Sequence, residues 1–253
     1  MRRTIFLFLL ASVLAGCVAP SVAPDPSILR VGVTPDSPPI IFKRDGQISG
    51  IEADFAWKLG EALNREVVFI EVPWHKQDAY LRNNRIDILM SGIIIVPARS
   101  TSMDFTTPYL NSGLTGLFRR NNYDPSGLIK SAIKNQTKEI GFVAGSSGEH
   151  FVLQNFPSAE HVSFSDVQSA VESLKKGHID LFIHDAPVVW WFSSLNRAQL
   201  ISFPQLFNTE PLAWGVGRQN RVLREQINGL IAQWEKDGTS EKIVNNWIPS
   251  LGN

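Results

Sequence analysis

The 253-residue sequence contains a single cysteine, Cys17, and its 24 basic side chains are balanced by 24 acidic ones. One cysteine excludes an internal disulfide, and the five histidines form no cluster, so a structural zinc site is not expected. Zero net charge gives no sign of a nucleic-acid or polybasic membrane surface. The sequence also lacks a G-x-S-x-G nucleophile motif, a P-loop and a dinucleotide fingerprint. We therefore expect no metal, no cofactor and no nucleic-acid partner.

The N-terminus begins with two arginines and continues into an apolar run over residues 5–15. This pattern is typical of a secretory signal. The apolar run is shorter than the stretch expected of a membrane-spanning helix. Residues 14–17, Leu-Ala-Gly-Cys, resemble the lipobox of bacterial lipoproteins, which implies that Cys17 is acylated and that 1–17 is a signal peptide. An ordinary secretory peptide with an incidental cysteine is the alternative. Residues 18–28, rich in proline, are predicted to form an extended tether.

Strand-like and helix-like patterns alternate over 29–90 and again over 139–183. This β-α-β-α-β order predicts two α/β units with mostly parallel sheets and right-handed crossovers. Apolar residues every four positions predict a helix from Ile51, with Glu52 and Asp54 near its positive end. Ser146 and Glu149 have the spacing of a capping box, which predicts a helix start just after Gly145.

Two segments, 81–87 and 174–180, each place a leucine five residues ahead of an Ile-Asp pair that opens an apolar strand. This similarity indicates two related lobes, although a chance likeness of standard helix-turn-strand units remains open. The last part of the chain is expected to return to the first lobe. Lobe 1 would then comprise 29–115 and 214–253 and lobe 2 would comprise 120–209. The strands at about 113–120 and 211–218 would cross between the lobes as a hinge.

The stretch 86–110 is the best candidate for a binding site. Residues 86–90 are predicted to form a buried parallel strand that ends at Ser91 and Gly92 and is followed by a loop with Arg99. Ligands of α/β sheets bind at the carboxyl ends of strands, so we expect Arg99 to bind the carboxylate of a small molecule.

Together these segments resemble the bacterial extracellular solute-binding proteins of family 3, the amino-acid-binding type that serves ABC importers. The resemblance covers 29–248, and its motifs are Leu-Arg-Val-Gly-Val at 29–33, Gly-Ile-Glu-Ala-Asp at 50–54, Val-Pro-Trp at 72–74, the stretch 86–99, Asp-Phe-Thr-Thr-Pro-Tyr at 104–109, Ile179-Asp180 through Asp185, and 237–242. It implies a two-lobed periplasmic-binding-protein fold of type II with a two-strand hinge.

The resemblance also implies roles for individual residues. Arg99 would bind the ligand's α-carboxylate together with the backbone amides of Ser146 and Ser147, and Asp185 would accept the α-ammonium group. Contacts from Ser91 or Gly92 and a pocket wall from Trp74 complete the implied site. The alternatives are a solvated Arg99, a helix-capping Asp185 beside Pro187, and a core position for Trp74.

Two positions depart from the family pattern. Ile94 occupies a position where amino-acid binders commonly have a hydroxyl that bonds the carboxylate, and Ser37 replaces an aromatic residue that stacks over the ligand. The pocket would therefore bind an amino acid with different contacts, or another small carboxylate.

The sequence thus predicts a monomeric, non-enzymatic lipoprotein of the cell envelope, or periplasm, that binds an amino acid or related carboxylate and delivers it to an ABC permease in the inner membrane. Val18 after Cys17 favours the outer membrane if the cell is Gram-negative. Two alternatives stay open. One is an enzyme similar to cyclohexadienyl dehydratases, against which Val188 counts because an acidic residue is expected there. The other is a ligand-sensing accessory lipoprotein.

Overall fold

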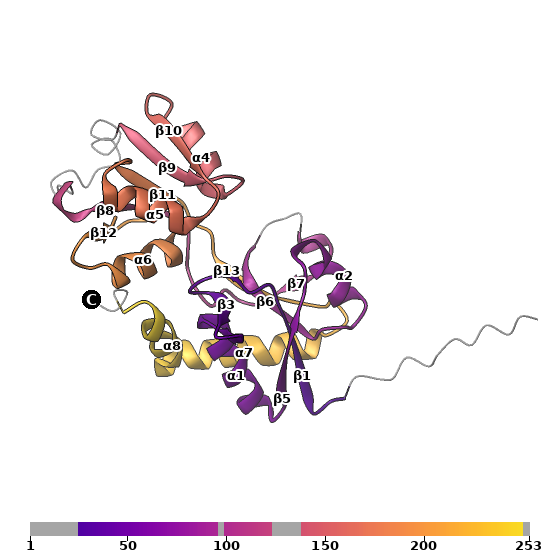
Figure 1. Cartoon of the computed structure of the whole chain (residues 1–253). Coiled ribbons are helices and arrows are strands. Elements are labelled where there is room, and N and C mark those ends of the chain that lie inside the picture. The colour runs from indigo at the N-terminus through magenta and orange to yellow at the C-terminus, as the bar shows by residue number, and fades with distance from the viewer. Residues whose placement is uncertain (1–24, 96–98, 123–137, 250–253) are drawn as a thin grey trace, which may run out of the picture.

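The computed structural model describes residues 25–95, 99–122 and 138–249. It has the expected α/β fold with two lobes, each built on a five-stranded sheet flanked by helices (Figure 1). Cys17, the signal segment and most of the tether lie outside the described residues. In the described part of the chain, no helix combines the length and apolar character needed to cross a membrane.

The first sheet has the strand order β5-β1-β6-β13-β7. The three strands β5, β1 and β6 are parallel, and β13 and β7 are antiparallel to their neighbours. The strands are β1 (Ile28–Val33), β5 (Glu66–Glu71), β6 (Ile88–Ile94), β7 (Asp104–Phe105) and β13 (Leu212–Val216). Strand β13, which comes from the last part of the chain, thus pairs within this first sheet.

The second sheet repeats this arrangement in the order β10-β9-β11-β8-β12. Again three parallel strands are followed by two antiparallel ones. The strands are β8 (Leu114–Arg119), β9 (Glu139–Val143), β10 (Glu160–Phe164), β11 (Leu181–Asp185) and β12 (Leu200–Ser202). The carboxyl ends of the parallel strands are where each sheet can present residues to a ligand.

Helices cover both faces of each sheet, and a small sheet of β2 (Asp36–Ser37), β3 (Ile41–Arg44) and β4 (Gln47–Ser49) lies on the first lobe. In the first lobe the helices are α1 (Ile51–Leu63), α2 (Gln77–Arg82), α7 (Arg221–Asp237) and α8 (Thr239–Trp247), with short 3-10 turns at Trp74–Lys76 and Arg99–Thr101. In the second lobe they are α4 (Ser147–Asn155), α5 (Val167–Lys176) and α6 (Ala186–Leu195), with a 3-10 turn at Arg120–Asn122.

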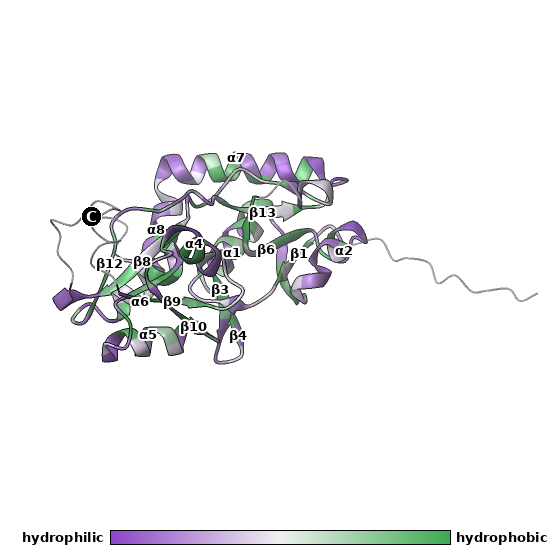
Figure 2. Ribbon diagram, turned by 90° about the horizontal axis from the view of Figure 1, so that it is seen from above, coloured by the Kyte–Doolittle hydropathy of each residue, from purple (hydrophilic) through white to green (hydrophobic). Residues whose placement is uncertain are grey.

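The long helix α7 buries one apolar face. Leu223, Ile227, Ile231 and Trp234 are buried against the core of the first lobe, which also contains α1 and α8. Polar residues occupy the other face of α7. Hydrophilic and hydrophobic residues therefore alternate along the helix (Figure 2). An apolar face of this width, packed on a sheet, stabilises the helix more than its intrinsic propensity does.

The two Ile-Asp pairs have matching roles in the two lobes. Asp87 forms an ion pair with Arg30 at 2.7 Å and accepts the Arg30 backbone amide at 2.8 Å. Asp180 forms an ion pair with Arg119 at 3.2 Å and accepts the Glu139 amide at 3.3 Å. In chain order, each aspartate lies just before the third parallel strand of its lobe and bonds to the first parallel strand. This shared contact is a physical reason for the similarity of the two segments.

Two paired segments connect the lobes. The Leu212 amide donates to Leu110 O at 2.9 Å, the Glu210 amide to Ser112 O at 2.7 Å, and the Phe207 amide to Leu114 O at 2.7 Å. These segments overlap the N-terminal ends of the strands that the sequence analysis expects at about 113–120 and 211–218. Strand β8 lies wholly in the second sheet and β13 wholly in the first.

Candidate functional site

Strand β6 does not end at Ser91 and Gly92 as the sequence predicts, but continues to Ile94. Its pairing with β13 is irregular there, because Ile93 lies opposite Ala213 whereas Leu89 lies opposite Gly215. Gly92 has a φ of 63°, a conformation that favours glycine. Its amide donates to the Glu52 carboxyl at 2.9 Å instead of to a neighbouring strand. The predicted loop is thus a bulge inside a strand.

Arg99 begins the 3-10 turn that follows β6 and lies over the Trp74 ring, with the guanidinium carbon 4.5 Å from the ring centroid. Its Nη1 donates to Gln77 Oε1 at 3.1 Å. Trp74 is 51% exposed, so it is not a core residue. Among the described residues, no carboxylate lies within ion-pair distance of Arg99. A stacked guanidinium with only a neutral partner is suited to bind an added carboxylate.

A chain of hydrogen bonds joins Arg99 to the β6 bulge. Gln77 Nε2 donates to Thr34 Oγ1 at 2.9 Å, and the Thr34 amide donates to Ser91 Oγ at 2.9 Å. Arg99, Trp74, Ser91 and Gly92 therefore lie along one edge of the first sheet.

The second lobe contributes the start of α4 and the end of β11. Ser146 caps α4 as predicted: its Oγ accepts the Glu149 amide at 3.3 Å, and the Glu149 carboxylate accepts the Gly145 amide at 2.7 Å. The Ser146 amide itself donates to Val143 O at 3.2 Å, so it is not the free donor that the sequence analysis expects at this helix start.

Asp185 ends β11 and precedes α6, but its side chain makes no capping hydrogen bond to that helix. Instead Asp185 Oδ1 accepts a hydrogen bond from Ser147 Oγ at 3.1 Å. The Asp185 side chain is 41% exposed. The structure thus brings Ser147 and Asp185 together and leaves carboxylate surface for a ligand.

Two cavities lie between the lobes. The smaller, about 30 Å³, contains Ser37, Gly92 and Ile94 from the first lobe and Asp185 from the second in its lining. The larger, about 700 Å³, is lined by Ser37 together with Ser146. Five of the predicted residues therefore line these two cavities: Ser37, Gly92, Ile94, Ser146 and Asp185. The other four, Arg99, Trp74, Ser91 and Ser147, line neither.

The cleft also contains acidic residues that the sequence did not single out. Glu210 lines the smaller cavity beside Asp185, and its pKa is raised by burial and by the Asp185 charge, against the opposing hydrogen bond from Asn208. Asp36 and Asp166 line the larger cavity, and burial raises the pKa of Asp36. Glu210 lies in the segment between β12 and β13, which contains no sequence motif, so no sequence signal identifies it.

His184 also lines the larger cavity, and the sequence analysis gives it no role. Burial lowers its pKa, although the Asp185 charge opposes that change, so the ring is neutral at pH 7. Its Nδ1 accepts the Asp185 amide at 2.8 Å, which assigns the ring proton to Nε2. A neutral imidazole in this position offers a hydrogen-bond donor without cancelling the charge of Asp185.

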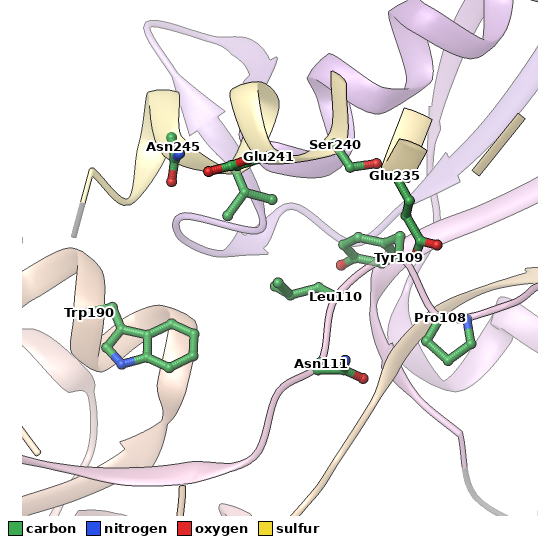
Figure 3. A pocket seen from close by; sticks show the side chains of 10 residues that line it. Pro108, Tyr109, Leu110, Asn111, Trp190, Glu235, Ser240, Glu241 and Asn245 are labelled. Atoms are coloured by element: carbon green, nitrogen blue, oxygen red, sulfur yellow. The ribbon is translucent and has the colours of Figure 1, made fainter. Parts of the chain in front are cut away.

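A further cavity of about 350 Å³ lies where α6 faces α8, and Trp190 and Leu110 lie on opposite sides of it (Figure 3). None of the predicted ligand-binding residues lines it. Trp191, the next residue of α6, does not line this cavity; it lines the larger cavity of the cleft, and its ring centroid lies 5.9 Å from that of Phe42.

Comparison with known proteins identifies the family to which these features correspond. The model of the bacterial extracellular solute-binding proteins, family 3, matches residues 29–250. The L-cystine-binding protein TcyJ of Escherichia coli K12 is 27% identical over 87% of this chain and 82% of its own. ABC transporter arginine-binding protein 1 of the same strain is 27% identical over 98% of this chain and 100% of its own.

Solved structures with the same fold include the ancestral cationic amino acid solute-binding protein AncCDT-1. It is 28% identical, with a TM-score of 0.81 over 88% of this chain and 96% of its own. An ancestral cyclohexadienyl dehydratase, 23% identical over 88% of this chain and 93% of its own, has a TM-score of 0.61 and shares the fold.

Proposed function

Because the chain belongs to the bacterial extracellular solute-binding proteins of family 3, we propose that it captures an amino acid between its lobes and delivers it to an ABC importer. The observation that carries this proposal is the shared cavity in which Gly92 of the first lobe and Asp185 of the second lobe meet. Asp185 would accept the α-ammonium group. Arg99, with the amides at the start of α4, would bind the α-carboxylate.

We infer that the ligand's side chain is cationic. The two cavities are lined by four carboxylates, Asp36, Asp166, Asp185 and Glu210. One of them would pair with the α-ammonium group, which leaves negative charge for a second cation. The names of arginine-binding protein 1 and of the ancestral cationic amino acid binder agree with this inference.

The lobes would close on the ligand by rotation about the paired segments 110–114 and 207–212. These are the two chain crossings, so the first sheet with its helices would move as one body and the second sheet with its helices as the other, as far as the described residues show. The Asp185 carboxylate, now partly exposed, would become desolvated as the cleft closes.

We further propose that the protein is not an enzyme. Val188 is an apolar, buried residue that lines both cavities, at the position where the resemblance to dehydratases requires an acid. The relatives that are 27% identical are named as binding proteins. Incubation with prephenate or arogenate should therefore give no aromatic product.

Acylation of Cys17 would attach the monomeric protein to a membrane of the cell envelope, where it meets its permease. The lipobox-like segment 14–17 supports this proposal. Pull-down of a permease rather than a sensor from the same envelope would distinguish transport from a sensing role.

A panel of amino acids should identify the ligand by its effect on thermal unfolding. Protein that has been unfolded and refolded to remove bound ligand is expected to be stabilised most by L-arginine, L-lysine or L-histidine. At a hundred times the dissociation constant the gain should be about 2.7 kcal/mol. L-aspartate and L-glutamate are the matched controls and should have no effect. A folded, empty protein that no amino acid or small carboxylate stabilises would contradict the proposed function.

A further inference from the structure

Glu52 is a fully buried carboxyl group that lies behind the cleft. The sequence suggests a residue that interacts with the helix dipole, but its side chain has no exposed surface. Helix α1 starts against the loop before β3, where the Ile51 and Glu52 amides donate to Pro39 O and Ile40 O, each at 2.9 Å. Gly50 makes this approach possible, because a Cβ there would collide with the Ile40 carbonyl. The backbone thus directs Glu52 into the lobe interior.

The Glu52 carboxyl bonds directly to the backbone of the ligand cleft. Its Oε2 accepts the Gly92 amide at 2.9 Å, at the bulge where β6 loses its regular pairing with β13. Gly92 lines the same small cavity as Asp185. One hydrogen bond therefore joins a buried acid to a backbone position that faces the ligand.

No described cation balances a charge on Glu52. Its Oε1 is buried beside the Tyr109 hydroxyl and the Trp214 indole nitrogen, both of which face the carboxyl, and none of these three atoms has another hydrogen-bond partner among the described residues. Tyr109 is the titratable side chain that faces it, and among the described residues no lysine, arginine or histidine lies within ion-pair distance. Burial raises the pKa of Glu52 to about 8, against the opposing effects of the Gly92 amide, Tyr109 and Trp214. At pH 7 the neutral acid therefore predominates.

We propose that Glu52 is a positioning residue of the ligand cleft: as a neutral carboxyl it fixes the Gly92 backbone for ligand binding, and loss of its proton weakens that binding. An ionised carboxyl here would have hydrogen-bond donors, but no cation among the described residues would balance its buried charge. Such a charge favours movement toward water, which would displace Gly92 with it. The effect on affinity rests on the proposed function, whereas the contact with Gly92 does not.

The backbone part of the proposal is tested without ligand, from the amide NMR signal of Gly92 between pH 6 and 10. In the unchanged protein this signal should titrate with a midpoint near 8. Glu52→Gln is isosteric with the neutral acid and should abolish the titration. Asp54→Asn is the matched control on the same helix, where Asp54 accepts a bond from Trp247 Nε1 at 2.7 Å, and it should leave the titration unchanged. A Gly92 signal that does not titrate, or that titrates equally in Glu52→Gln, would overturn the proposal.

The functional part is tested with L-arginine, or with the amino acid that stabilises the protein most in the thermal panel. At pH 7 the dissociation constants of the unchanged protein and of Glu52→Gln should agree within about threefold. At pH 9.5 the unchanged protein should bind at least about tenfold more weakly than Glu52→Gln does at the same pH. The ligand's own ammonium titrates equally in both experiments, so their ratio isolates Glu52. If the unchanged protein and Glu52→Gln had equal affinities at pH 7 and also at pH 9.5, the positioning role would be overturned. Failure of every amino acid to bind would contradict the proposed function. In that case the NMR titration of Gly92 would still test its contact with Glu52.

Discussion

Arg99→Ala is expected to weaken amino-acid binding by about 2–5 kcal/mol, or roughly 30-fold to several thousand-fold, because a desolvated ligand carboxylate would lose its cation. The guanidinium is already held in place by the Trp74 ring and the Gln77 carbonyl, so little side-chain entropy is lost when the ligand binds. Isothermal titration with the amino acid selected by the thermal panel measures the loss.

Two further variants separate charge from geometry. Arg85→Ala is the matched control, because Arg85 also lies over an aromatic ring, that of Tyr80 at 5.3 Å, and has no proposed role in binding. It should leave affinity unchanged. Arg99→Lys keeps a positive charge but loses the planar fork, and an intermediate affinity is expected. Unchanged binding by Arg99→Ala would show that the carboxylate is bound elsewhere.

Asp185→Asn is expected to reduce affinity by a similar amount, about 2–4 kcal/mol, since it removes the charge that faces the α-ammonium group. The asparagine oxygen can still accept the Ser147 hydroxyl, so the fold around α4 should be preserved. The melting temperature of the ligand-free variant checks this.

Glu210→Gln provides the comparison for Asp185→Asn. Both residues line the small cavity, but Glu210 already has a partner in Asn208, whose Nδ2 donates to it at 2.9 Å. Its replacement should weaken binding of L-arginine and L-lysine more than binding of neutral amino acids. An Asp185→Asn variant that binds as tightly as the unchanged protein would contradict the ammonium site.

Local sequence signals predicted much of the fold. The helix start at Ser146 is confirmed, because a capping box depends on residues within a single helical turn. The Ile-Asp pairs indicated two related lobes, and both aspartates indeed bond to the first strand of their lobe. The predicted α/β order follows directly from such short-range patterns.

Features that depend on distant contacts could not be predicted. The continuation of β6 through Gly92 requires Glu52, forty positions earlier in the chain, and an irregular register with β13. Glu52 looked like a surface acid at a helix start, because sequence spacing does not show that Gly50 brings the helix against the Ile40 carbonyl. Glu210 gave no signal for the same reason: its importance comes only from its position beside Asp185.

The most direct measurement compares three ligands with one side chain by isothermal titration: L-arginine, agmatine, which lacks the α-carboxylate, and argininic acid, which lacks the α-ammonium group. If Arg99 and Asp185 bind the two charges of one zwitterion, each analogue should bind at least about a hundredfold more weakly than L-arginine. The Arg99→Ala variant should then discriminate poorly against agmatine, and Asp185→Asn against argininic acid. An analogue that binds the unchanged protein as tightly as L-arginine would contradict the two-charge site.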